Sequence, residues 1–216
     1  MGRTLPLLLL AAIAAAGPDP RAAAREEGDV RARFELALDH EAHGLAKEAR
    51  AAHEAVLLLD PGHRASRRAL GYARREGGWV PDDARLRELC ARADASREGE
   101  RRRAIRFLSE CAVEPRALAA LIRRVLLDQT TALRAAALEA MRPAGKEATR
   151  RLVAALDSSS AAVRLRAIDA LGRWGDAAAV PALRLRYRLA GGSSQGAWIG
   201  QTRQQAFLGD FDVEIA

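Results

Sequence analysis

The four histidines are the residues of this chain with the most versatile chemistry: His40, His43, His53 and His63. His40 and His43 are three residues apart, which places them one turn apart on a helix, a spacing that can supply half of a zinc site. Glu41 and His53 could complete a ligand set only if their helices crossed favourably. We therefore expect solvated or core-edge histidines and no bound metal.

Nucleophilic catalysis needs a Ser or Cys beside a base and a group that orients the base. The three serines Ser158 to Ser160 are typical of a polar turn between helices, and the chain has neither a G-x-S-x-G sequence nor a phosphate-binding P-loop. The sequence predicts no catalytic residue, no cofactor and no enzymatic activity.

Cys90 and Cys111 are the two cysteines of the chain, and they leave two alternatives. In an oxidising compartment they could form one disulfide. Each also lies among helical apolar positions, where a free thiol packs as a small hydrophobic group. We favour packing, and the absence of C-x-x-C or Cys/His spacing gives no reason to expect zinc.

The N-terminal residues 1–17 have the pattern of a secretory signal peptide. Arg3 precedes an apolar run from Leu7 to Ala16, which ends in the cleavage pattern Ala14-x-Ala16. The run is shorter than the roughly 20 apolar residues that span a membrane. We expect a cleaved signal, a periplasmic or secreted protein and no membrane span.

Composition favours an all-α protein. Ala, Leu and Arg dominate a chain of 216 residues that is 49% hydrophobic but only 4% aromatic. The net charge of +7 comes from 35 basic and 28 acidic residues, which alternate along the predicted helices. This alternation indicates a solvated surface, so we expect another protein as the partner, with an acidic protein as one candidate, and we do not expect nucleic acid.

An internal repeat organises residues 84–189. One helix pattern recurs 30 positions later: Leu133-Arg134-x-x-Ala137-Leu138-x-Ala140-Met141 and Val163-Arg164-x-x-Ala167-Ile168-x-Ala170-Leu171. Gly145 and Gly175 follow in the turns, and a degenerate earlier copy begins at Ala104. After Pro115 this copy continues with an amphipathic stretch whose apolar stripe is Leu118, Leu121, Ile122, Val125 and Leu126. A helical pair cannot cover its own apolar face, so we expect about three units to form an α-solenoid of stacked antiparallel helical hairpins.

The last unit resembles the HEAT-like repeat of the phycobilisome-lyase type. The similarity rests on this set of residues: Leu156-Asp157, Val163-Arg164, Ala167-Ile168, Ala170-Leu171-Gly172, Trp174-Gly175-Asp176 and Ala179-Val180-Pro181-x-Leu183. The resemblance implies an α-solenoid that binds proteins, and only some members are enzymes. Nothing in the sequence supports lyase activity on phycobilin chromophores.

Two kinds of charged residue recur in these units. Asp128 and Arg134 bracket one inter-unit turn, and Asp157 and Arg164 bracket the next. The carboxylates can accept hydrogen bonds from the N–H groups of the following helix, and the arginines can pair with carboxylates of neighbouring repeats. We expect these four residues to form a structural ladder.

Residues 29–76 resemble a tetratricopeptide repeat (TPR) followed by the first helix of another. The matching residues are Leu36-Ala37, Ala49, Val56, Asp60-Pro61 and Leu70-Gly71-Tyr72, although His40 and His53 replace the usual aromatic residues. A plain helical hairpin is the alternative. Residues 77–83 contain Gly, Trp and Pro, and we expect them to be a junction in which Trp79 packs and Asp82 caps the next helix.

Residues 190–216 change from helical spacing to a Gly/Ser linker and a short β segment. Phe211, Val213 and Ile215 alternate with acidic residues in the period of a half-buried strand. Such a segment predicts a small C-terminal β extension, through which copies of the chain could associate.

The sequence thus predicts a non-enzymatic scaffold or adaptor, exported from the cytoplasm. Arg124, Arg151 and Arg184 occupy one position per unit beside the apolar stripe and are candidates for binding the partner. The alternatives are a HEAT-like lyase or nucleic-acid-processing enzyme, and a self-assembling structural envelope protein.

Overall fold

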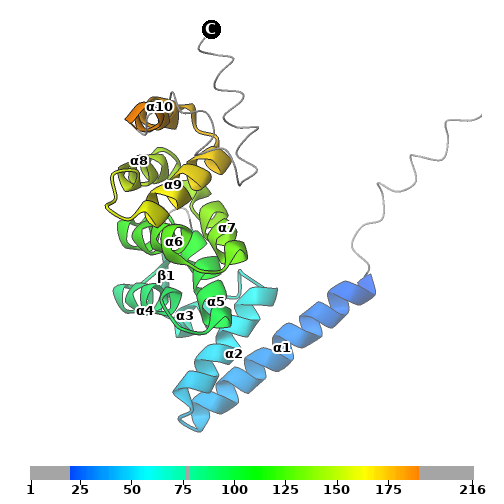
Figure 1. Ribbon diagram of the computed structural model, residues 1–216. Coiled ribbons are helices and arrows are strands. Elements are labelled where there is room, and N and C mark those ends of the chain that lie inside the picture. Colours follow the sequence, from blue (N-terminus) through cyan, green and yellow to red (C-terminus); the bar gives the residue numbers. More distant parts are fainter. Residues whose placement is uncertain (1–19, 76–77, 190–216) are drawn as a thin grey trace, which may run out of the picture. The chain divides into compact units, whose positions relative to one another are not determined.

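The computed structural model describes residues 20–75 and 78–189 (Figure 1). These residues form ten α-helices and two short strands, so the predicted mainly helical class is confirmed. The predicted signal peptide and the predicted C-terminal β segment lie outside the described residues. Within the described part, no helix combines the length and the apolar character needed to cross a bilayer.

The chain divides into two compact units, residues 1–79 and residues 80–216. The division falls between Trp79 and Val80, inside the stretch 77–83 that the sequence marks as a junction. Each unit is described by itself below.

Unit 1 is built on a helical hairpin. Helix α1 (Pro20–Ala42) packs along α2 (Ala46–Leu59), and Gly44 makes the turn between them with φ of +71°. Ala37 and Val56 are fully buried at this interface. The short helix α3 (Arg64–Ala69) then packs on α2.

A two-stranded sheet follows α3, where the TPR resemblance predicted a helix running through Tyr72. That prediction is wrong: the helix ends at Ala69, Gly71 turns the chain with φ of +79°, and β1 (Tyr72–Arg75) pairs with β2 (Gly78–Pro81). A left-handed residue at Gly71 cannot continue a helix, and Val80, which precedes Pro81, lies in the extended strand β2.

Unit 2 contains seven α-helices and two single turns of 3-10 helix among its described residues. Asp82 caps the first helix through a hydrogen bond of 2.7 Å from the Arg85 N–H to its carboxylate, which confirms the predicted cap. The elements of unit 2 are α4 (Asp83–Ala93), α5 (Glu98–Ser109), α6 (Pro115–Leu127), α7 (Thr131–Ala140), η1 (Arg142–Ala144), α8 (Gly145–Ala155), α9 (Ala161–Trp174), η2 (Ala177–Ala179) and α10 (Val180–Leu189).

Helix α6 is the centre of unit 2, since it contacts α4, α5, α7, α8 and α9. Its apolar stripe was predicted from spacing alone, and all five residues of that stripe are buried: Leu118, Leu121, Ile122, Val125 and Leu126. Burying a side chain of this size stabilises a fold by about 1.5–3 kcal/mol, so α6 contributes a large share of the core of unit 2.

The two clear copies of the repeat share their buried small residues and a glycine of positive φ. The four small residues of the repeat pattern are all buried: Ala137, Ala140, Ala167 and Ala170. Gly145 and Gly175 both adopt positive φ, of +47° and +72°, at the turns that follow α7 and α9. The turns themselves differ, since ψ is −120° at Gly145 and +22° at Gly175, so the two copies agree in the burial of their small residues and not in the detail of the turn.

A polar network fastens α8 to the turn after α9. The Trp174 indole N–H donates to the Thr149 hydroxyl at 2.9 Å, and that hydroxyl donates to the Asp176 carboxylate at 2.5 Å. Asp176 also accepts from the Ala178 N–H, which caps η2. These hydrogen bonds lower the pKa of Asp176 below its ordinary value.

The central position of α6 predicts an unequal response to truncation along this helix. Leu121→Ala removes a side chain with no exposed surface and should lower the free energy of unfolding by about 2–5 kcal/mol, since it leaves a cavity. Leu127→Ala, at a side chain that is 46% exposed, should cost less than about 1 kcal/mol. Urea denaturation followed by circular dichroism measures both, and equal losses would contradict the packing described.

Candidate functional site

The histidines of unit 1 take part in hydrogen bonds between helices. His53 on α2 is buried, its Nε2 lies 3.0 Å from a carboxylate oxygen of Glu41 on α1, and its Nδ1 lies 3.0 Å from the Ser66 hydroxyl on α3. His63 caps α3, and the ring of Phe34 packs on both His53 and His63. Among the described residues, no group of three or more His, Cys, Asp or Glu side chains could hold a metal ion.

Ser66, His53 and Glu41 are connected in the order of a Ser-His-acid triad, an arrangement that the sequence analysis did not anticipate. Ser66, however, has no exposed surface, and its hydroxyl also lies 3.0 Å from the ring of His63. A nucleophile must reach a substrate carbonyl, so a sealed hydroxyl cannot serve as one. The contact joins three helices of unit 1 and is structural.

Asp128 is a buried carboxylate at the turn between α6 and α7. Its side chain is 1% exposed, it accepts hydrogen bonds from the Thr130 N–H at 2.9 Å and from Arg101 at 2.8 Å, and Arg124 lies 3.7 Å away. Burial raises the pKa of Asp128, but the hydrogen bonds from Thr130 and Arg101 and the positive charges of Arg101 and Arg124 together hold it below its ordinary value of 3.8.

Three arginines make the same contact at the start of three successive helical pairs. Arg101, Arg134 and Arg164 each donate from one terminal nitrogen to the carbonyls five and six residues earlier, at 2.7–3.1 Å. We call this contact the arginine clasp. The sequence suggested that Arg134 and Arg164 would reach carboxylates of neighbouring repeats, but they satisfy the carbonyls of their own turns instead.

Asp157 is the equivalent of Asp128 at the next inter-repeat turn, but its side chain is exposed where that of Asp128 is buried. Its carboxylate is 74% exposed and pairs with Arg186 on α10. The structure therefore gives the four residues of the predicted ladder three kinds of role: a buried ion pair at Asp128, clasps at Arg134 and Arg164, and a surface ion pair at Asp157.

The three candidate partner-binding arginines differ in their exposure and in their contacts within unit 2. Arg124 is 12% exposed and bridges Asp94, at 2.7 Å, and Asp128. Arg151 is 30% exposed and donates to Glu147 at 2.7 Å and to the Pro115 carbonyl. Arg184 on α10 is partly exposed. Arg124 thus stabilises unit 2, while the less buried Arg151 is more available to a partner.

Cys90 and Cys111 are free thiols. Cys111 is 6% exposed and its thiol lies 3.6 Å from the Leu108 carbonyl, whereas Cys90 is partly exposed. Burial raises the pKa of Cys111 to about 12 and also raises that of Cys90. The packed-thiol alternative is the one that the structure contains.

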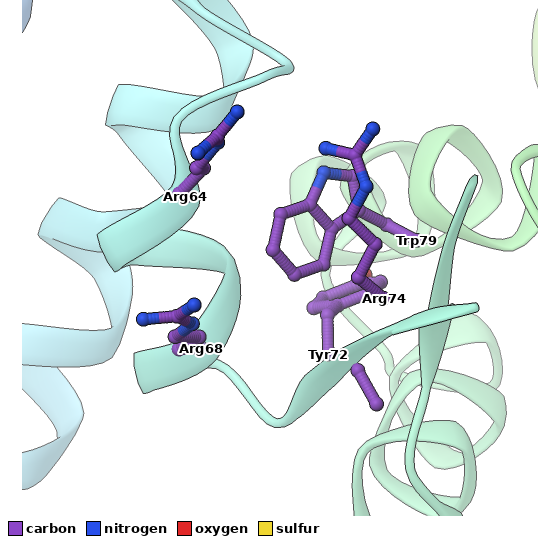
Figure 2. A pocket seen from close by; sticks show the side chains of 6 residues that line it. Arg64, Arg68, Tyr72, Arg74 and Trp79 are labelled. Atoms are coloured by element: carbon purple, nitrogen blue, oxygen red, sulfur yellow. The ribbon is translucent and has the colours of Figure 1, made fainter.

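Unit 1 holds a cavity of about 360 Å³ between α3 and the β1–β2 hairpin. Figure 2 shows Arg64 and Arg68 approaching from α3, with Arg74, Tyr72 and Trp79 on the hairpin side. The Arg74 guanidinium lies 5.9 Å from the centre of the Trp79 indole ring. We call this site the arginine cavity.

A sequence signal for this cavity exists and was missed. Between Pro61 and Arg75 the chain has five arginines and no Asp or Glu: Arg64, Arg67, Arg68, Arg74 and Arg75. The basic excess is therefore concentrated here and is not evenly interleaved with acid, as the composition suggested. Trp79, expected to be a packing residue, lines the cavity.

No family model, no curated protein and no solved structure matches the chain.

Replacing Asp128 should weaken the fold in a pH-dependent way. Asp128→Asn leaves Arg101 without its buried partner and should lower the free energy of unfolding by about 3 kcal/mol at pH 7. Because the pKa of Asp128 is below 3.8 in the folded protein, its ionised form stabilises the fold above that pH. The deficit of the variant should shrink as the pH falls below 3.8, where the wild-type carboxylate becomes protonated.

Asp157→Asn is the matched control for this experiment, since an exposed ion pair contributes less than about 1 kcal/mol. Denaturant titrations at several pH values measure both variants. Equal losses for the two, or a deficit at Asp128 that does not change with pH, would contradict the assignment.

The two thiols should react at very different rates. At pH 8, iodoacetamide should modify Cys90 slowly and leave Cys111 unmodified in the folded protein. Burial raises the pKa of both thiols, that of Cys111 to about 12, and Cys111 is also the less exposed of the two. Mass spectrometry should find both sites modified after unfolding without reductant. A disulfide between them, or equal rates in the folded state, would refute this prediction.

Proposed function

We propose that the chain is a non-enzymatic scaffold that binds another protein through the helices of unit 2, which form a short HEAT-like α-solenoid. The recurrence of the arginine clasp at Arg101, Arg134 and Arg164 is the observation that carries this proposal. Identical fastening at the start of successive helical pairs is what a repeat architecture requires, since each pair must present the same face to the next.

The contacts between helices support a serial arrangement. Helix α4 contacts α6, α5 contacts α7, and α6 contacts α8, so the first three helices of unit 2 each meet the helix next but one along the chain. A surface assembled in this way exists before the partner arrives. Binding then costs little ordering entropy, which favours protein recognition by a rigid helical face.

A hollow formed by α6, α7 and α9 favours an acidic partner. A shallow hollow of about 20 Å³ has an apolar floor that includes Val125 and Leu138, and a rim formed by Arg134, Arg166, Arg173 and Asp169. A hollow of that volume is close to the size of one water molecule, so it suits a side chain of a partner's surface better than a small-molecule ligand. The rim has an excess of positive charge, which would steer an acidic protein toward it.

The proposal includes export, with the periplasm or the cell exterior as the location, and this part rests on the pattern of residues 1–17 alone. The alternatives make different predictions. Salt-sensitive binding to duplex DNA would favour a nucleic-acid-processing enzyme. Association of copies that depends on residues 191–216 would favour a self-assembling envelope protein.

Affinity capture from cell-envelope extract tests the scaffold, with two adjacent arginines as a matched pair. Arg150 and Arg151 both pair with Glu147, but only Arg151 is one of the three predicted partner-binding arginines. Arg151→Gln should reduce the yield of the captured partner by about fivefold, the effect of losing roughly 1 kcal/mol, and Arg150→Gln should leave it unchanged.

Quantitative mass spectrometry of the captured proteins measures these yields, and circular dichroism checks that both variants keep their helices. A partner enriched on the wild type and released by 0.5 M salt supports the proposal. No protein enriched over an unrelated helical bait, or equal losses for the two variants, would count against it.

A further inference from the structure

The arginine cavity concentrates positive charge that the described part of the fold leaves without counter-charge. Arg64, Arg68 and Arg74 are exposed, and none of them has a carboxylate partner among the described residues. Most arginines of unit 2 behave differently, since they pair with Asp or Glu or bind backbone carbonyls. Guanidinium groups that line one cavity without counter-charge repel one another, so the fold gains from an anion bound in that cavity.

The spacing of the two helical arginines suits a single compact anion. Arg64 and Arg68 are four residues apart on α3, which separates their backbones by about 6 Å along the helix axis. Guanidinium groups at that separation can close on one phosphate from two sides, each with paired N–H donors. A phosphate monoester carries a charge of about −1.5 to −2 at pH 7, close to what two or three arginines neutralise.

The aromatic side of the cavity suits a planar group. Trp79 lines it, and Arg74 lies over the indole at 5.9 Å, which holds the ring in place by a cation–π contact (Figure 2). Stacking of a planar ring on an aromatic side chain contributes about 1–3 kcal/mol. The volume of about 360 Å³ is near the lower end of small-molecule sites, so it admits one ring and one phosphate group.

We propose that the arginine cavity is a binding site for a small phosphate monoester that carries a planar ring, of the size of a nucleoside monophosphate. The phosphate lies between Arg64 and Arg68, and the ring lies against Trp79. This site is in unit 1 and is independent of the scaffold function proposed for unit 2, so either can fail without the other.

Isothermal titration calorimetry of the full chain tests the site with three probes. Adenosine 5′-monophosphate contains both parts of the ligand, ribose 5-phosphate lacks the ring, and adenosine lacks the phosphate. Adenosine 5′-monophosphate should bind at one site. The dissociation constants of ribose 5-phosphate and of adenosine should each be higher by a factor of about ten or more, since each probe loses at least about 1.4 kcal/mol of binding free energy.

Variants locate the binding. Arg68→Gln and Trp79→Leu should each weaken adenosine 5′-monophosphate about tenfold, whereas Arg33→Gln, which removes an exposed arginine of α1, should leave it unchanged. Binding should also weaken below about pH 6, where the phosphate takes up its second proton while the arginines keep their charge.

Three results would overturn the proposal. The first is no saturable binding of adenosine 5′-monophosphate. The second is equal affinity for ribose 5-phosphate or for adenosine, which would remove the role of the ring or of the arginines. The third is an equal effect of Arg33→Gln and Arg68→Gln, which would mean that overall charge, and not this cavity, attracts the anion.

Discussion

The fold of unit 2 depends on hydrogen bonds that arginine side chains donate to backbone carbonyls in the turns between its helices. Helix ends expose carbonyls without intrahelical partners, and a chain this poor in aromatic residues has few large side chains with which to cover them. The arginine clasp supplies donors at three successive turns. Because a guanidinium has five N–H donors in a fixed fork, one side chain can hold two carbonyls and still contact a carboxylate.

Arg101 shows how the arginine clasp joins neighbouring helical pairs of unit 2. The same side chain binds two carbonyls of its own turn and the buried carboxylate of Asp128, which precedes the next helical pair. Asp128 in turn lies beside Arg124, and Arg124 reaches back to Asp94. Charges alternate along this path, so each buried ion is compensated and the turns are tied together without a disulfide or a metal ion among the described residues.

The two units use arginine for different purposes. In unit 2 most of these side chains are engaged inside the fold, and the apolar contacts of α6 with its neighbours provide the packing. In unit 1 the helices are held by Phe34 and the hydrogen bonds of His53, whereas Arg64, Arg68 and Arg74 line a cavity. This contrast separates residues that stabilise the fold from residues that are available to a ligand.

The sequence by itself determined the helical class, the buried stripe of α6, the small residues at Ala137 and Ala170, and the cap at Asp82, because all of these depend on spacing within one element. It failed where two conformations had to be weighed: the helix expected through Tyr72 gives way to a strand, since Gly71 turns the chain. Only the tertiary structure decided that Ser66 meets His53, that Asp128 is buried while Asp157 is exposed, and that Arg64 faces Trp79 across a cavity. Those relations join residues on different elements, and their distances depend on how the elements pack, which periodicity along the chain does not encode.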